Sequence, residues 1–244
     1  MDALYHDPAL AVLYDWDNPW PVDFDWFLTL VEGADTALDL GCGTGIFSVA
    51  LAARGAEVVG VDPAAAMLDV ARARPGGDAV RWIEAPAQGL DLRRRFQAVV
   101  MTGHAFQTLL RAEDRAACLA TIARHLAPGG RFFLDSRNPD AREWEQWTPE
   151  ATREVRAHPE YGALERWNAA EETDVPGVIE YQTHYRLQDG RHWQARSRIA
   201  FPGFDELAGA IAAAGLRVDR WHGDPWGGPL QPGCPDFIPL GGLA

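Results

Sequence analysis

Residues 35–139 alternate between short apolar runs and longer segments in which apolar residues recur every three or four positions. The apolar runs predict strands, and the longer segments predict helices. The expected strands are residues 36–40, 57–61, 80–84, 98–102 and 131–135, and the expected helices are residues 46–54, 64–74 and 111–126. Strands and helices that alternate at this spacing form βαβ units, so we expect a parallel sheet with helices on both faces.

After Pro139 the pattern changes to alternation with a period of two. Residues 178–187 alternate in this way, Asp189-Gly190 is typical of a hairpin turn, and residues 192–199 predict the returning strand. Residues 140–200 are therefore interpreted as an antiparallel β insertion. Beyond it the pattern predicts one more helix and two closing strands, at residues 204–215, 217–222 and 236–240.

The predicted elements together indicate an α/β fold. We expect a Rossmann-like, doubly wound, mostly parallel seven-stranded sheet with an antiparallel β insertion after its fifth strand. The sheet and its helices should occupy residues 35–139 and 201–244, with the insertion at residues 140–200. Residues 1–34 contain seven aromatic residues and a short helix expected at 23–31, so they predict an N-terminal aromatic helical cap.

Charge and cysteine content narrow the possible partners. The net charge is −13, and all 22 basic residues are arginine. An acidic chain lacks the positive surface that a nucleic acid requires, so nucleic acid is not an expected partner. The three cysteines are too far apart for a Cys-x-x-Cys metal site, and no metal is expected. Because no segment resembles a signal peptide or a membrane helix, we expect a cytoplasmic protein without a membrane partner.

A glycine-rich stretch joins the first strand to the helix that follows it. Glycines at positions 41, 43 and 45 allow the backbone to turn sharply and to approach a ligand closely. A nicotinamide dinucleotide fold would show the spacing G-x-G-x-x-G, but Ile46 stands at the third glycine position. Asp39 precedes the loop, where a carboxylate repels a diphosphate and suits an ammonium group.

A second acid follows the second strand. Asp62 lies 17 residues after Gly45, at the carboxyl end of that strand. A carboxylate in this position can accept hydrogen bonds from both hydroxyls of a ribose. A ribose with an amino acid group nearby indicates S-adenosylmethionine, in which adenosine is joined to an amino acid.

At these positions the sequence resembles the class I S-adenosylmethionine-dependent methyltransferases. Residues 38–45 (LDLGCGTG) resemble the first motif of that family, residues 60–68 the second, and residues 126–132 (LAPGGRF) the stretch before its fifth strand. The resemblance covers roughly residues 36–137 and the closing elements after residue 204. It implies a Rossmann-like fold, S-adenosyl-L-methionine as cofactor, and in-line transfer of a methyl group.

The resemblance also implies which residues bind the cofactor. Asp39 and the glycine loop would surround the methionine part, Asp62 the ribose, and Pro63 and Met67 the adenine. Where the family often has an aspartate for the adenine amino group, this chain has Pro86, so Ala87 and Gln88 would take its place. The full expected set is Asp39, Gly41, Cys42, Gly43, Gly45, Asp62, Pro63, Met67, Ala87, Gln88, Met101, Thr102 and Gly103.

Four further residues are candidates for catalysis or for acceptor binding. His104 lies in a segment that faces the methyl group in the family, and it is either a general base or a structural histidine that bonds backbone. Tyr14 and Trp20 would place aromatic faces beside the sulfonium, or would only pack the first helix. Arg137 would bind an anionic acceptor, or would form a surface ion pair.

We therefore predict a methyltransferase that acts on a nitrogen or oxygen nucleophile of a small molecule. The insertion would cover the acceptor site, contribute to a homodimer, or both. A non-catalytic S-adenosylmethionine-binding protein remains an alternative because of Pro86. A nicotinamide-dependent oxidoreductase is disfavoured by Ile46.

Overall fold

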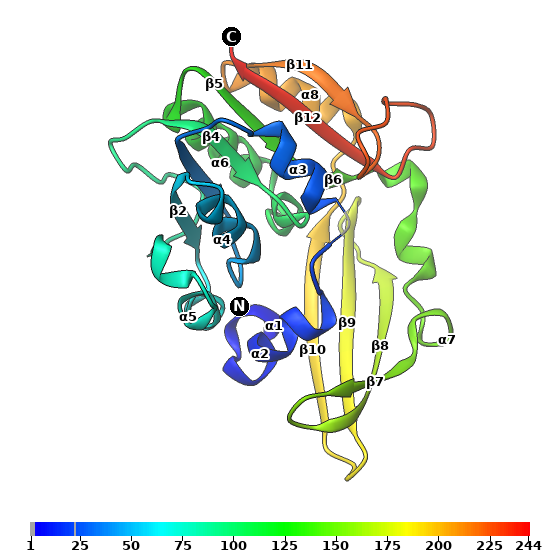
Figure 1. Cartoon of the computed structure of the whole chain (residues 1–244). Helices are drawn as coiled ribbons and strands as arrows, with labels where there is room; N and C mark the ends of the chain where they lie inside the picture. The colour runs from blue at the N-terminus through cyan, green and yellow to red at the C-terminus, as the bar shows by residue number, and fades with distance from the viewer. Residues whose placement is uncertain (1–2, 22) are drawn as a thin grey trace.

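Two β-sheets organise the chain, of which the computed structural model describes residues 3–21 and 23–244 (Figure 1). In the larger sheet seven strands follow the order β11-β12-β5-β4-β1-β2-β3, and a two-residue strand, β6 (Ser136–Arg137), pairs with β12. Strands β1 to β5 pair in parallel, whereas β12 pairs antiparallel with β5, β6 and β11. The strands are β1 Thr36–Leu40, β2 Glu57–Asp62, β3 Val80–Glu84, β4 Phe96–Met101, β5 Leu126–Leu134, β11 Leu216–His222 and β12 Asp236–Leu243. The predicted Rossmann-like sheet is confirmed.

Helices cover both faces of the larger sheet. Successive residues of a strand point to opposite faces, so Ala98 and Val100 of β4 pack with α3 and α4, while Val99 and Met101 pack with α6 and α8. This two-sided cover explains why the strands are continuous apolar runs. The helices of this unit are α3 Phe24–Leu30, α4 Ile46–Ala53, α5 Ala65–Ala73, α6 Ala112–His125 and α8 Phe204–Ala213.

The prediction for the start of β5 was wrong. The strand begins at Leu126, directly after α6, and it includes the Pro-Gly-Gly stretch that was expected to separate the helix from the strand. Gly129 adopts a φ of +77°, and the pairing of β5 with β4 shifts register between Phe96 and Ala98. An irregular first half of the strand therefore conceals it from a pattern of alternating positions.

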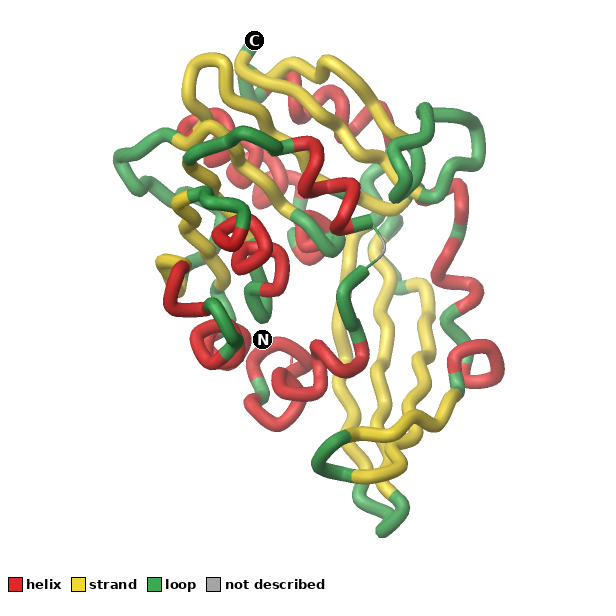
Figure 2. The backbone as a smooth tube through the Cα atoms, viewed as in Figure 1, coloured by secondary structure: helices red, strands yellow, loops and turns green. Residues whose placement is uncertain are grey.

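The insertion forms a second, four-stranded antiparallel sheet beside the first (Figure 2). Its order is β10-β9-β8-β7, and the hairpin predicted at residues 178–199 is present as β9 and β10. Strands β7 and β8 were not predicted. Their charged residues form ion pairs with neighbouring strands, such as Glu165 with Arg186, and these charged positions mask the alternation of apolar residues. The elements are α7 Pro149–Thr152, β7 Glu154–His158, β8 Gly162–Glu172, β9 Val178–Leu187 and β10 His192–Ala200.

The N-terminal segment forms two helices that were not predicted, α1 (Ala3–His6) and α2 (Pro8–Asp17). Asp7 caps α2 by accepting a hydrogen bond from the backbone of Ala9, and Pro8 fits the first helical position. Both helices lie between α5 and the insertion sheet, whereas α3 packs on the larger sheet. The predicted cap, 1–34, therefore consists of two separate parts. Residues 1, 2 and 22 of it lie outside the described residues.

Candidate active site

A cavity of about 890 Å³ lies at the carboxyl ends of β1, β2 and β4, between the larger sheet, helices α1 and α2, and the insertion sheet. In open α/β sheets ligands bind at this edge. Small-molecule sites usually measure about 300–1,000 Å³, so the cavity is large enough for a cofactor together with a small acceptor.

The glycine loop after β1 lines one end of the cavity, but its N–H groups are largely used inside the protein. The N–H groups of Gly41 and Cys42 both donate to the carbonyl oxygen of Val61, at 2.8 and 3.1 Å, and that of Gly43 donates to Asp62. A diphosphate site needs such loop N–H groups free to face the ligand. The loop therefore does not suit a dinucleotide, in agreement with the spacing of its glycines.

Gly43 and Gly45 serve different purposes in this loop. Gly43 lines the cavity at a φ of +53°, and no atom lies within 4 Å of where its Cβ would stand, so a ligand can approach the backbone closely. At Gly45, a Cβ would lie 2.3 Å from the ring of Trp82, and Gly45 does not line the cavity. Gly45 is therefore required by packing against β3.

Asp62 at the end of β2 is fixed by two backbone hydrogen bonds. Its Oδ2 accepts from the N–H of Gly43 at 2.9 Å, and its Oδ1 accepts from the N–H of Ala64 at 2.8 Å. Burial raises its pKa, and these two hydrogen bonds counteract that rise. Each carboxylate oxygen keeps a further lone pair, and Asp62 lines the cavity, so a pair of ribose hydroxyls can be bound there.

Asp39 lies behind the loop rather than on the wall of the cavity. It is 1% exposed, and its Oδ2 accepts a hydrogen bond from Oγ of Ser48 at 2.6 Å. Its Oδ1 has no hydrogen-bond partner within residues 3–21 and 23–244. Burial raises the pKa of Asp39 to about 7. Any action of Asp39 on a ligand is therefore through charge and through the position of α4, not through direct contact.

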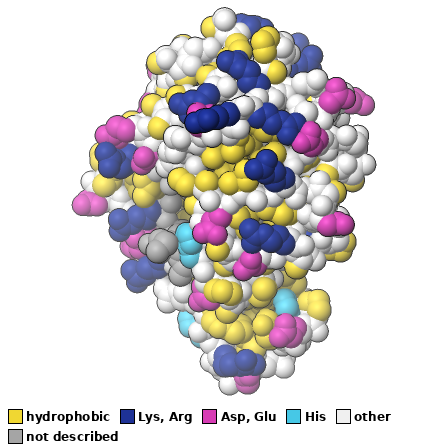
Figure 3. All heavy atoms as spheres, turned by 90° about the vertical axis from the view of Figure 1, so that its left-hand side faces the viewer, with side chains coloured by type: hydrophobic (Ala, Val, Ile, Leu, Met, Phe, Trp, Pro, Cys, Tyr) yellow, Lys and Arg dark blue, Asp and Glu magenta, His cyan; other side chains and the backbone are white. Residues whose placement is uncertain are grey.

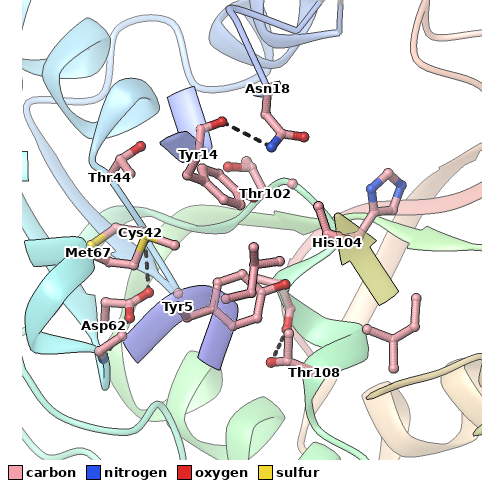
Figure 4. A pocket seen from close by; sticks show the side chains of 18 of the residues that line it. Tyr5, Tyr14, Asn18, Cys42, Thr44, Asp62, Met67, Thr102, His104 and Thr108 are labelled. Atoms are coloured by element: carbon pink, nitrogen blue, oxygen red, sulfur yellow. Dashed lines mark hydrogen bonds between the residues drawn. The ribbon is translucent and has the colours of Figure 1, made fainter. Parts of the chain in front are cut away.

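The remaining residues expected around the cofactor all line the cavity; they are Pro63, Met67, Ala87, Gln88, Met101, Thr102 and Gly103. In Figure 4 Asp62, Cys42 and Met67 lie at one end of the pocket and His104 at the other. Tyr5, Tyr14 and Thr102 lie between them. These three residues thus lie between the end that contains Asp62, which is the expected cofactor end, and a second end that contains His104.

His104 lines this second end in an unusual conformation. Its φ is +58°, and its backbone N–H donates to the carboxylate of Asp135 at 3.0 Å. The ring Nε2 lies 2.9 Å from Oδ1 of Asp236 and 3.7 Å from Oδ2 of Asp135. The ring does not cap the following 3-10 helix. Its partner is a carboxylate, which differs from the backbone contact considered from the sequence.

Tyr14 and Trp20 occupy different environments. Tyr14, on α2, lines the cavity, and burial together with the nearby Tyr181 raises the pKa of its hydroxyl far above the usual range. Trp20 is 37% exposed, donates its Nε1–H to Asp25 at 3.2 Å and packs edge-on against Phe24. Trp20 does not line the cavity, although Asn18 and Pro21 on either side of it in the sequence do.

Arg137 also lines the cavity, from β6. Its Nε donates to Glu143 at 2.9 Å, its Nη1 donates to Gln107 at 3.1 Å, and its guanidinium lies 5.2 Å from the ring centre of Trp147. No described residue accepts a hydrogen bond from Nη2. The guanidinium is therefore held on two sides and keeps donors free for a ligand.

From the sequence the insertion is expected over the acceptor site, but Asp15 and Asp17 of α2 and most of the insertion side chains that line the cavity were not identified as part of the site. On α2, Asp15 accepts a hydrogen bond from Oγ1 of Thr44 and pairs with Arg74. Asp17, at the end of the same helix, pairs with Arg166 at 2.5 Å and accepts from the hydroxyl of Tyr185. Helix α2 thus links the glycine loop to the insertion.

The insertion contributes mainly polar side chains to this wall. On β10, Arg198 pairs with Glu180 at 2.7 Å, and Arg196 lies 3.5 Å from the same carboxylate. The insertion residues that line the cavity are Trp147, Arg166, Asn168, Glu180, Tyr181, Thr183, Tyr185, Arg196, Arg198 and Ile199. No local spacing signals them, because the sheet must form before they come together.

Comparison with known proteins agrees with this geometry. Residues 37–130 match a family model described as "Methyltransferase domain". The ubiquinone biosynthesis O-methyltransferase of Pseudomonas paraeruginosa is 33% identical over 169 residues, which cover 62% of this chain and 72% of that protein. The cypemycin N-terminal methyltransferase of a Streptomyces species is 41% identical over 104 residues, or 43% of this chain and 42% of that protein.

The chain spans only about half of the length, or less, of several relatives that it matches, and the cypemycin enzyme is one of these. Among solved structures, the CcbJ methyltransferase from Streptomyces caelestis has the same fold, with a TM-score of 0.78, 22% identity and 96% of each chain covered. None of the helices in the described ranges has the length and apolarity needed to cross a bilayer. From the Pseudomonas relative and the matched domain, we conclude that this chain belongs to the class I S-adenosylmethionine-dependent methyltransferases.

Proposed function

We propose that the protein transfers a methyl group from S-adenosylmethionine to a nitrogen or oxygen nucleophile of a small molecule. The observation that carries this proposal is the two-ended cavity, in which Asp62 and the glycine loop face one end and His104 and Arg137 face the other. Such a cavity can bring two small molecules together in a fixed orientation, which is the main requirement for an in-line displacement.

The cofactor end fits S-adenosylmethionine. Asp62 has one free lone pair on each oxygen for the ribose hydroxyls, and the open space beside Gly43 admits the rest of the ligand. Pro63 and Met67 would flank the adenine, with Ala87 and Gln88 at its edge. When bound, the cofactor supplies a methyl group that is already activated on a positively charged sulfur.

The second end fits the acceptor. We assign His104 as the general base that removes a proton from the acceptor, since an imidazole changes charge near neutral pH. Arg137 would bind an anionic or carbonyl group of the acceptor with its free Nη2. Tyr14 would place its ring near the sulfonium, where aromatic faces attract cations.

Size and surface charge favour a small acceptor. Helices α1 and α2 and the insertion sheet form part of the wall of the cavity and narrow the space for an acceptor. On the face shown in Figure 3, arginine side chains are interspersed with acidic ones, and no continuous basic patch marks a nucleic-acid surface. By their names, the two relatives act on an amino terminus and on an oxygen, which leaves both nucleophiles open. The cytoplasmic location and the homodimer stay predictions.

The test combines binding with turnover. Calorimetry should show that the purified protein binds S-adenosylmethionine and does not bind NADH. Release of S-adenosylhomocysteine is then measured across small amines, phenols and carboxylates, with and without an anionic group. Binding without turnover on any acceptor would favour the non-catalytic alternative. Failure to bind S-adenosylmethionine would refute the proposal.

A further inference from the structure

Both the backbone and the ring of His104 are held by carboxylates. Its left-handed backbone is fixed by the hydrogen bond from its own N–H to Asp135, a residue that is 1% exposed. A non-glycine residue in this region is strained and persists only when its surroundings impose it. The buried carboxylate of Asp135 therefore determines the direction in which the imidazole leaves the backbone.

The two ring nitrogens of His104 have different environments. Nε2 lies 2.9 Å from the carboxylate of Asp236, the first residue of β12, and an ionised carboxylate only accepts hydrogen bonds. Nδ1 has no hydrogen-bond partner in the part of the chain that the structure describes. In a neutral imidazole one nitrogen carries the proton and the other accepts, so this arrangement protonates Nε2 and leaves a lone pair on Nδ1.

We propose that Asp236 is a positioning residue, which holds His104 as the tautomer whose unprotonated Nδ1 accepts the acceptor's proton. The proposal rests on the proposed function and deepens it. Asp236 is 132 residues from His104 in sequence, and the pairing of β12 with β5 and β6 brings the two together. Its own place is fixed, because its backbone pairs with Arg137 and its N–H donates to Gly223.

The step balances as follows. The acceptor nucleophile forms a bond to the methyl carbon, and the carbon–sulfur bond breaks with its electron pair remaining on sulfur. The acceptor's N–H or O–H bond breaks, and its proton moves to Nδ1 of His104. The ring then carries a positive charge, while its Nε2–H remains bonded to Asp236. Asp236 does not take the proton, but its negative charge stabilises the imidazolium that forms.

Besides Asp236, three other charged residues lie near the His104 ring, and two of them are carboxylates. Asp135, at the end of β5, lies near Nε2 of His104. Asp23, just before α3, interacts electrostatically with both Asp135 and His104. Burial and the neighbouring Asp135 raise the pKa of Asp23 to about 6. Arg137, from β6, is also near Asp135 and acts in the opposite sense. The ring of His104 is therefore surrounded by more carboxylates than cations.

The first test needs no turnover. The full-length protein, labelled with ¹⁵N on histidine, is examined by two-bond ¹H–¹⁵N correlation NMR, and His104→Gln identifies the His104 signals among the seven histidines. We expect the neutral ring to carry its proton on Nε2, with a downfield proton resonance that moves upfield in Asp236→Asn. The control Asp219→Asn, an exposed position on β11, should leave the resonance unchanged. A proton on Nδ1, or an Nε2 proton unaffected by Asp236→Asn, would overturn the proposal.

The second test separates positioning from folding. Asp236→Asn should lower kcat by roughly 10- to 100-fold, while KM and the Kd for S-adenosylmethionine stay unchanged. Removal of the carboxylate that orients a metal-binding histidine has an effect of this size. In the His104→Ala background the same substitution should have no further effect, because the two residues act as a unit. An equal loss in both backgrounds, or an unchanged kcat, would contradict the proposal. If the wild type turns over no acceptor, the proposed function fails, and the NMR result still decides the role of Asp236.

Discussion

Replacement of Asp62 by asparagine tests the cofactor site most directly, because it changes the charge and hydrogen bonding at one fixed position and keeps the shape. In the native protein each oxygen of Asp62 accepts one backbone N–H and keeps a lone pair for the cavity. In Asp62→Asn one oxygen becomes an amide nitrogen. It then faces the N–H of Gly43 or of Ala64, so two donors oppose each other and one ribose hydroxyl loses its acceptor.

The magnitude follows from this exchange. A hydrogen bond to a charged group contributes about 1.5–3 kcal/mol, which corresponds to a Kd for S-adenosylmethionine raised roughly 10- to 150-fold. The unpaired backbone N–H of the loop adds to the loss. Removal of the whole side chain in Asp62→Ala should weaken binding by a similar amount, about 1–3 kcal/mol.

Calorimetry with S-adenosylhomocysteine and with its 2′-deoxy analogue makes the test specific. The wild type should prefer the ribose compound, and Asp62→Asn should lose much of this preference. Asp69→Asn on α5 is a suitable control, because that side chain is 74% exposed and pairs only with Arg72 among the described residues. Wild-type affinity in Asp62→Asn, or no preference for the ribose compound in the wild type, would refute the assigned role of Asp62.

Three further substitutions and one negative control follow from the structure. Burial raises the pKa of Asp39 to about 7, so the folded protein holds this proton more tightly than the unfolded chain and loses stability as pH rises from about 4 to about 7. Asp39→Asn should therefore raise the free energy of unfolding at pH 8 by a few kcal/mol, ~4 at most, and leave it nearly unchanged at pH 4, as measured by denaturant unfolding at both pH values. Arg137→Met should raise KM for anionic acceptors and spare both kcat and neutral acceptors, and equal effects on both kinds of acceptor would argue against anion binding. Asp17→Asn removes the charge that pairs with Arg166, so hydrogen exchange in α2 should accelerate, and unchanged exchange would show that α2 is held by other contacts. Trp20→Ala should leave the affinity for S-adenosylmethionine unchanged, and weaker binding would place Trp20 at the ligand despite its exposed position.

The sequence predicts the parallel sheet well and identifies most of the residues that line the proposed cofactor end of the cavity, because their signals are local. A strand, its glycines and the acid at the end of the next strand all lie within 27 residues, from position 36 to position 62. The hairpin at residues 178–199 is also local, since Asp189-Gly190 marks its turn. In such cases neighbouring residues alone specify the conformation.

From the sequence, His104 and Arg137 are candidates for the second end, but the side chains that hold them in place could not be predicted, because these meet only in the folded chain. His104 and Asp236 are 132 residues apart. Asp17 and Arg166 come from a helix and a strand whose contact no spacing indicates. The glycine motif itself mixes two roles, since Gly43 faces the cavity and Gly45 faces Trp82, and the sequence alone does not separate them.

Two stretches of the chain form different parts of the cavity. Residues 37–130, which match the methyltransferase family model, contribute most of the cofactor end. Strands β8 to β10 form much of the opposite wall. Under the proposed function, substitutions in those strands should change which molecule is accepted without disturbing the residues around the methyl donor. The insertion is thus a natural unit for exchange, and a chimera that carries the corresponding strands of a related enzyme would be a direct route to a new acceptor.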